Sequence, residues 1–176
     1  AGLRGLPAGE WHAYGRTGDG QRYSPLDQIT TANVAGLQEA WHIHTGDLRG
    51  QPGDPEETTY EVTPLKIGKT LYLCNPHQTV LALDATTGAE IWRFDPRLQG
   101  KLALQHLTCR GLSYRAPRAS AAMATPMPMP TSAPDACAAN GKLFMPTADG
   151  RLIALDPASG KPCTGFGPAQ GQIDLW

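Results

Sequence analysis

The sequence lacks the features that mark several large classes of protein. Charge of neither sign is in excess, with 15 Lys and Arg residues against 16 Asp and Glu residues. Because no basic stripe or polybasic patch stands out, neither nucleic acid nor an anionic membrane surface is an expected partner. The longest apolar runs, such as residues 70–73 and 80–83, are far too short to span a bilayer.

The first ten residues lack the basic and apolar regions of a signal peptide. Two readings remain open: the chain is cytosolic, or a targeting segment has been removed or left out. Close pairs of cysteine are missing too, which argues against a zinc site. An even number of separated cysteines fits disulfides in an oxidising compartment, with three possible connectivities, and equally fits buried, reduced thiols. The four cysteines are Cys74, Cys109, Cys137 and Cys163.

Strand signals dominate what is present, and long helical periodicity is missing. Residues 31–37 are at most a short helical turn, with Thr31 as its cap. Short β-rich runs bounded by Gly, Pro, Asn and Asp predict the strands, and the second and third of them form a hairpin. The predicted strands are residues 37–45, 69–74, 79–83, 90–94, 142–146 and 151–155.

A repeat organises these strands. TVLALDATTGAEIW (residues 79–92) can be laid over RLIALDPASGKPCT (residues 151–164). Repeats of a four-stranded unit of about 40–50 residues are typical of β-propellers. The copies here are further apart because a Pro-, Ala-, Ser- and Met-rich stretch at residues 116–135 intervenes, and its composition predicts a disordered insertion. Alternating Met and Pro at residues 127–130 could suggest a soft copper site, but low-complexity loop is the favoured interpretation.

The first repeat contains the pattern Ala82-x-Asp84-x3-Gly88-x3-Trp92. Asp84 can accept backbone hydrogen bonds in a turn, Gly88 can adopt a left-handed conformation, and Trp92 can dock on a neighbouring blade. This pattern resembles the tryptophan-docking motif of the eight-bladed quinoprotein dehydrogenases. The second repeat keeps Ala154, Asp156 and Gly160 but has Thr164 in place of the tryptophan.

The resemblance extends along nearly the whole chain and is strongest to the PQQ-dependent, membrane-bound glucose dehydrogenases. QHLTCRG at residues 105–111, GFG at 165–167 and IDL at 173–175 point to these enzymes over the quinate enzymes. Further matching strings are WHAYGR at residues 11–16, QRYSPL at 21–26, EAWHIHTGD at 39–47 and YEVTP at 60–64.

The implied fold is all-β, a partial eight-bladed propeller with about two blades. Residues 1–58 would be a leading segment whose strand around Trp41 closes the ring, residues 59–98 the first blade and residues 104–167 the second. Two blades cannot close a ring, so we expect the chain to be an N-terminal fragment of the propeller, inactive by itself.

The resemblance also implies a cofactor-binding role for three residues. Glu61 would hydrogen-bond to the edge of PQQ, His106 would cover its plane, and Arg110 would pair with one of its carboxylates. Without the resemblance, Glu61 is a solvated loop acid, Arg110 a surface cation and His106 a partly buried strand residue. A disulfide between Cys109 and Cys137, which bracket the insertion, is feasible, and free thiols remain open.

The implied reaction is oxidation of D-glucose to gluconolactone, with electrons passed to ubiquinone at the periplasmic face of the bacterial inner membrane. A Ca²⁺ or Mg²⁺ ion and an aspartate general base would come from other blades. The sequence therefore predicts no catalytic residue and no metal ligand in this chain. Asp54, Asp135 and Asp149 do not match the family's motifs, and His42 with His44 lacks a third ligand.

Three alternatives remain open, the third being a free-standing two-blade interaction module produced by truncation. The first keeps the class but changes the substrate to quinate, shikimate or another polyol. The second is a non-catalytic propeller that acts as a binding scaffold. A scaffold needs neither the glutamate of YEVTP nor the string from His106 to Arg110, so both features favour the enzyme.

Overall fold

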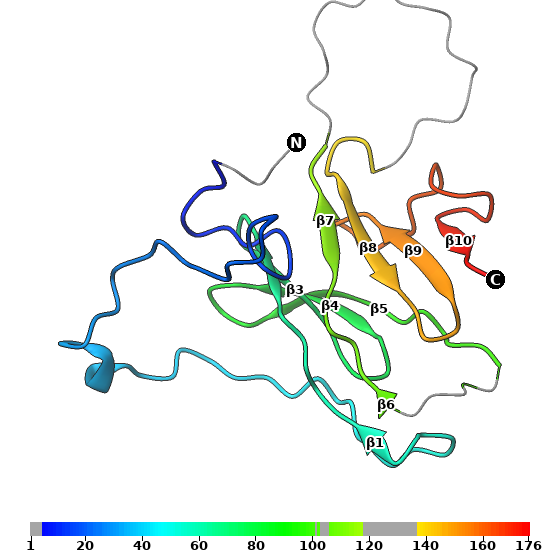
Figure 1. Cartoon of the computed structure of the whole chain (residues 1–176), viewed down its shortest axis with the longest axis horizontal. Helices are drawn as coiled ribbons and strands as arrows, with labels where there is room; N and C mark the ends of the chain where they lie inside the picture. The colour runs from blue at the N-terminus through cyan, green and yellow to red at the C-terminus, as the bar shows by residue number, and fades with distance from the viewer. Residues whose placement is uncertain (1–4, 101, 103–105, 118–136) are drawn as a thin grey trace, which may run out of the picture.

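The computed structural model describes residues 5–100, 102, 106–117 and 137–176 of the chain. In these residues the regular structure consists of strands and one 3-10 turn, η1 (Val34–Gly36), which confirms the all-β prediction (Figure 1). The strands are β1 (Glu57–Thr58), β2 (Leu65–Ile67), β3 (Thr70–Cys74), β4 (Val80–Asp84), β5 (Glu90–Phe94), β6 (His106–Leu107), β7 (Ser113–Arg115), β8 (Lys142–Pro146), β9 (Arg151–Leu155) and β10 (Gln172–Asp174).

Two four-stranded antiparallel sheets form the body of the molecule. Their strand orders are β2-β3-β4-β5 and β7-β8-β9-β10, so each sheet joins strands that are consecutive in the sequence. The two sheets lie side by side in Figure 1, and residues 20–45 extend away from them as a long arm. Each sheet is one propeller blade, and the prediction of a partial propeller with two blades is confirmed. The second sheet continues to β10, past the boundary expected at residue 167.

The turn residues explain why the hairpin prediction was accurate. At the tip between β3 and β4, the Asn75 side chain accepts a hydrogen bond from the backbone N–H of Thr79, with 2.8 Å between N and Oδ1. Gln78 takes a left-handed φ of 67° in this tip. Its side-chain oxygen accepts a bond from the backbone N–H of Ala148 in the second blade, at 2.7 Å. The tip therefore closes the hairpin and ties the two blades together.

The main core lies between the blades. Tyr72, Val80 and Ala82 on the facing side of the first blade share one buried cluster with Leu143 and Ile153 of the second blade. The opposite side of β3 and β4 contributes a second cluster of Leu73, Leu81 and Leu83, against which Trp41 packs. Because both sides of β4 are covered, residues 80–83 are buried without alternation, as a strand covered on both faces requires.

The motif Ala82-x-Asp84-x3-Gly88 builds the turn after β4 as predicted. The Asp84 carboxylate accepts bonds from the backbone N–H groups of Thr87 and Thr86 at 2.8 and 2.9 Å. These bonds, that of Thr87 foremost, lower the pKa of Asp84. Gly88 takes a φ of 73°, a conformation that L side chains rarely adopt.

In both repeats, the glycine of this turn is in contact with the ring of a tryptophan that precedes it in the sequence. A Cβ atom added to Gly160 would lie 2.5 Å from Cε3 of Trp92, and one added to Gly88 would lie 2.5 Å from Cε3 of Trp41. The indole N–H of Trp92 also donates to the carbonyl oxygen of Pro157, at 3.0 Å. Trp92 therefore packs on the second blade, and Trp41 makes the same contact with the first blade.

Residues 37–45, predicted as a strand, form no strand. A strand needs a neighbour for its backbone groups, and no strand of the described ranges pairs with these residues. They follow a 3-10 turn that begins after Asn33, so the prediction of Thr31 as its cap was also wrong. Trp41 nevertheless reaches its docking position on Gly88.

Two disulfides form, and neither is the pairing of Cys109 with Cys137 that the sequence left feasible. Cys74 bonds to Cys109, with 5.8 Å between the Cα atoms, and Cys137 bonds to Cys163, with 5.5 Å. The reason is the direction of the side chains. Cys109 lies in the cluster between the blades, where β3 ends at Cys74, whereas Cys137 belongs to a separate cluster on the other side of the second blade.

Most of the predicted insertion at residues 116–135 lies outside the described residues, as do the Met and Pro residues at 127–130. Within the described part of the chain, no helix has the length and apolar character needed to cross a bilayer.

Candidate functional site

The candidate site is built on two short segments that run side by side. β1 and β6 pair in parallel, with Glu57 opposite His106 and Thr58 opposite Leu107. The pairing continues as the backbone N–H of Thr59 donates to the carbonyl oxygen of Leu107 at 3.1 Å. It ends at a bridge between Thr63 and Gly111. This arrangement holds residues 59–63 against residues 106–111, although more than 40 residues separate them in the chain.

Alternation in residues 106–110 divides the segment into two faces. Leu107 and Cys109 are 3% and 6% exposed and point into the core, where the disulfide to Cys74 holds them at the end of β3. By the same alternation, His106, Thr108 and Arg110 lie on the other face. The core residues therefore anchor the segment, and its polar residues are presented together.

The structure brings the three predicted cofactor residues together. The Glu61 carboxylate lies 3.8 Å from Nε2 of His106 and 3.5 Å from Nε of Arg110. The side chains of Glu61, His106 and Arg110 are 39%, 28% and 74% exposed. Their role toward a cofactor stays a prediction. The cluster presents one carboxylate, one imidazole and one guanidinium on an open surface.

Thr59 completes this cluster, and Thr108 lies between His106 and Arg110 on the same segment; no motif in the sequence pointed to either. The Thr59 hydroxyl lies 3.0 Å from Oε1 of Glu61 and also hydrogen-bonds to Nε2 of His106. The Thr108 hydroxyl is buried and finds no partner among the residues described. The available signal was the alternation of polar residues in QHLTCRG, which places Thr108 between His106 and Arg110 on one face.

Metal ligands are not gathered anywhere in the described ranges, where no three His, Cys, Asp or Glu side chains form a group that could hold an ion. In the pair of His42 and His44, Nδ1 of His42 donates a hydrogen bond to the Glu39 carboxylate at 2.8 Å. Asp149, which matches no catalytic motif, is paired with Arg151 at 2.6 Å. Burial by itself would raise the pKa of Asp149, but hydrogen bonds from Arg151 and Thr147 outweigh it and lower that pKa to about 2.

A second polar cluster joins the leading segment to the tip of the first blade, and no sequence signal singled it out. The two ring nitrogens of His77 face the carboxylates of Asp47 and Asp54, the latter at 2.7 Å. A carboxylate only accepts, so both nitrogens must carry protons and His77 is an imidazolium. Asp54 also accepts from the backbone N–H groups of Gly50 and Gln51, each at 2.8 Å.

The contacts of His77 with Asp47 and Asp54, which we call the His77 clasp, make the stability of the fold depend on pH. Burial alone would lower the pKa of His77, but hydrogen bonds to Asp54 and Asp47 outweigh it and raise the pKa above its ordinary value of 6.5. A raised pKa means that the contribution is fully present below pH 6.5 and is lost as the pH rises through the pKa of the folded state. We therefore expect His77→Gln to destabilise the protein by about 2 kcal/mol at pH 6 and by less at pH 9.

The measurement is thermal unfolding of the wild type and the variant from pH 6 to pH 9. His44→Gln is the control, because His44 is a neighbouring histidine for which the described residues supply no ion pair. A difference in Tm that stays the same across this range would contradict the clasp.

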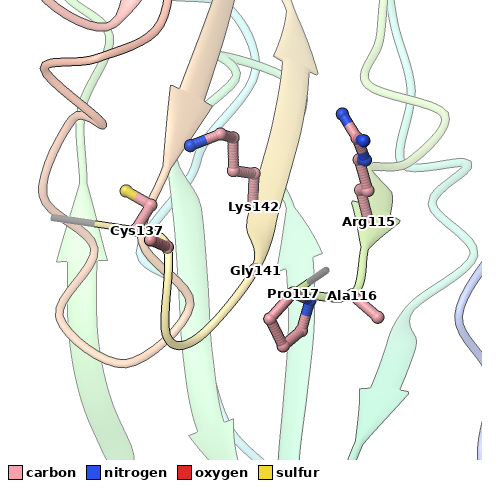
Figure 2. Close-up of a pocket in the computed structure, with 7 residues that line it drawn as sticks. Arg115, Ala116, Pro117, Cys137, Gly141 and Lys142 are labelled. Carbon is pink, nitrogen blue, oxygen red and sulfur yellow. The ribbon is translucent and has the colours of Figure 1, made fainter. Parts of the chain in front are cut away.

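Two hollows lie away from the candidate site. One, of 320 Å³, lies at the end of β7 and β8, where Figure 2 shows Arg115, Ala116 and Pro117 on one side and Cys137 on the other, with Gly141 and Lys142 between them. The other, of 680 Å³, is mainly apolar and lies between residues 41–49 and the first blade, over Leu71, Leu73 and Leu83. Neither includes Glu61, His106 or Arg110.

Comparisons with known proteins agree with the geometry. Residues 11–176 match the family model described as "PQQ: Glucose/ethanol/alcohol dehydrogenase, beta-propeller domain". The chain is 47% identical to a quinoprotein glucose dehydrogenase of Gluconobacter oxydans over 97% of its own length and 20% of that relative. It is 45% identical to quinoprotein glucose dehydrogenase A of Acinetobacter calcoaceticus, over 97% of the chain and 21% of the relative. A probable quinate dehydrogenase of Xanthomonas campestris is 36% identical over 99% of the chain and 22% of the relative.

Solved structures show the same relationship. A europium-containing methanol dehydrogenase superposes with a TM-score of 0.62 at 33% identity, over 89% of this chain and 22% of that one. A quinohemoprotein alcohol dehydrogenase from Pseudomonas putida gives a TM-score of 0.59 at 26% identity, over 96% of this chain and 19% of that one. The chain spans about one fifth of the length of the curated relatives it matches. On its sequence and its fold, the chain belongs to the β-propeller family of the PQQ-dependent quinoprotein dehydrogenases.

Proposed function

We propose that this chain forms the first two blades of a PQQ-dependent dehydrogenase that oxidises D-glucose to gluconolactone, and that it supplies one wall of the cofactor site. The observation that carries the proposal is the meeting of Glu61, His106 and Arg110 on the paired segments of β1 and β6. Glucose is favoured over quinate because the identity is 45–47% to three glucose dehydrogenases and 34–36% to two quinate dehydrogenases.

The residues present suit such a cofactor. PQQ is a flat quinone with three carboxylates, and it needs cationic and hydrogen-bonding partners at its edge and a flat or apolar cover on its face. Arg110 is bound to Glu61 through Nε, which leaves its two terminal amino groups for a carboxylate. The orphaned hydroxyl of Thr108 on the same segment is a further group that gains from an added polar partner.

The chain's own residues would bind and orient, not react. Arg110 would hold a carboxylate, Glu61 would fix the direction of the Arg110 guanidinium and hydrogen-bond to the cofactor edge, and His106 would cover the ring plane. When bound, PQQ supplies the acceptor for the two electrons removed from the sugar. The Ca²⁺ or Mg²⁺ ion and the aspartate general base would come from blades outside this chain, which is why the chain alone is expected to be inactive.

The wider setting is part of the proposal. Electrons would pass to ubiquinone, and the propeller would face the periplasm at the bacterial inner membrane. Two disulfides, Cys74–Cys109 and Cys137–Cys163, support an oxidising compartment, because disulfides are rare in the reducing cytosol.

Arg110→Lys in the intact protein tests the cofactor site. Lysine keeps the charge but loses the planar fork, so we expect the Kd for PQQ to rise about tenfold, and about a hundredfold for Arg110→Ala. The measurement is a PQQ titration followed by quenching of tryptophan fluorescence. Arg115→Ala is the matched control, because Arg115 is an exposed arginine at the end of β7, five residues after Arg110 in the sequence.

The outcomes separate the alternatives. An unchanged Kd in both Arg110 variants would remove Arg110 from the cofactor site. A wild type without saturable PQQ binding would favour the scaffold over the enzyme. If PQQ binds but quinate, shikimate or another polyol is oxidised faster than glucose, the class stands and the substrate is wrong.

A further inference from the structure

The Thr59 hydroxyl connects two residues of the candidate cofactor site. It lies 3.0 Å from Oε1 of Glu61 and hydrogen-bonds to Nε2 of His106. Its position is fixed by the backbone, because the N–H of Thr59 donates to the carbonyl oxygen of Leu107 at 3.1 Å. Leu107 is buried in turn, so the hydroxyl is held beside the ring of His106.

The protons of this contact can be assigned one by one. A carboxylate has no proton to donate, so the single hydroxyl proton of Thr59 goes to Glu61. The hydroxyl oxygen then has only lone pairs to offer His106, so Nε2 of the ring must carry a proton and donate it to Thr59. The Glu61 carboxylate, 3.8 Å from the same Nε2, favours a proton at that nitrogen as well.

We propose that Thr59 is a positioning residue that holds neutral His106 in the tautomer protonated at Nε2 and fixes the orientation of its ring. Nδ1 is then the lone-pair nitrogen. The consequence for the cofactor rests on the proposed function: a ring held in one orientation covers the cofactor plane without first losing rotational freedom. Glu57, which is paired with His106 across the strands, and Arg110 are the other charged residues of this edge.

Two variants separate the hydroxyl from the shape of the side chain. Thr59→Val keeps the branched shape but removes the donor and acceptor, and Thr59→Ser keeps the hydroxyl and loses a methyl group. The side chain of Thr59 is exposed, so neither variant should prevent folding.

The first readout needs no cofactor. The intact protein is labelled with ¹⁵N-histidine, and the ring signals of His106 are assigned by their absence in His106→Gln. We expect Nε2 to be the protonated nitrogen in the wild type and in Thr59→Ser at a pH where the ring is neutral. In Thr59→Val the two ring nitrogens should move toward averaged shifts. Unchanged ring shifts in Thr59→Val would overturn the proposal.

The second readout is PQQ affinity. We expect Thr59→Val to raise the Kd about fivefold, with Thr59→Ser within about twofold of the wild type. If the Kd of Thr59→Val equals that of the wild type, the ring does not need Thr59 to cover the cofactor and the proposal fails. If the wild type binds no PQQ, the proposed function fails, and the ring shifts alone still decide whether Thr59 sets the tautomer of His106.

Discussion

Replacing both Cys74 and Cys109 by serine is expected to destabilise the protein by about 4 kcal/mol and to weaken PQQ binding at the same time. The stability loss follows from chain entropy, since the disulfide closes a loop with a sequence separation of 35. PQQ affinity should fall because Cys109 is buried in the core and anchors the segment that presents His106 and Arg110. Differential scanning calorimetry and PQQ titration measure the two effects.

The other disulfide is a matched control. Cys137–Cys163 has a sequence separation of 26, so its removal should cost a similar amount, about 3.5 kcal/mol. It lies in the cluster with Ala154, on the side of the second blade away from the main core. We expect its loss to lower Tm but to leave the Kd for PQQ unchanged. Equal losses of affinity from both replacements would show that affinity follows global stability and not the anchoring of residues 106–110.

Trp92→Ala is expected to destabilise the protein by about 3 kcal/mol. The variant removes a large, partly buried plate from the contact with Gly160 and leaves a gap between the blades. It also removes the hydrogen bond from the indole N–H to the carbonyl oxygen of Pro157. That oxygen keeps one partner, because the hydroxyl of Tyr72 donates to it at 3.0 Å.

Trp92→Phe separates packing from hydrogen bonding. Phenylalanine keeps an aromatic plate near Tyr72, whose ring centroid lies 5.8 Å from that of Trp92, but it cannot donate to Pro157. We expect it to recover about two thirds of the stability lost in Trp92→Ala. Thermal unfolding measures the total change, and hydrogen exchange should show the loss concentrated at the facing strands of the two blades. A Tm within one degree of the wild type for Trp92→Ala would contradict the docking role.

The strands could be predicted from the sequence where local chemistry decides them. β5, β8 and β9 have the predicted bounds, since Gly, Asp and Asn fix the turns on either side of a short apolar run. Residues 37–45 also contain β-forming residues but form no strand, because a strand needs a neighbouring strand to pair with and not only a suitable sequence of its own. β10 was not among the predicted strands. In the first blade the fourth strand, β5, directly follows the Asp84 turn, whereas in the second blade residues 161–171 separate β10 from the Asp156 turn.

The candidate site shows the same division. Glu61, His106 and Arg110 could be named because they lie in strings that resemble a known family. The hydroxyl of Thr59 could not, because its role depends on the register that places residue 59 beside residue 107. The disulfide connectivity and the clasp of His77 were hidden for a similar reason: each joins residues more than 20 positions apart, and composition says nothing about such distances.

The tryptophan contacts give the chain a direction. Trp41 packs on Gly88 and Trp92 packs on Gly160. At each of these two contacts the tryptophan comes from the earlier segment of the chain and the glycine from the later one. Structural units that contact only their neighbours behave as a linear series, in which the cooperativity of unfolding depends on the interface between each neighbouring pair.

Thr164 occupies the motif position at which the second repeat would carry its tryptophan. The series of contacts between a motif tryptophan and a following glycine therefore stops at Gly160. The indole contact that does cross this position runs the other way, from a later tryptophan to an earlier turn, because Nε1 of Trp176 donates to the carbonyl oxygen of Asp149 at 3.2 Å.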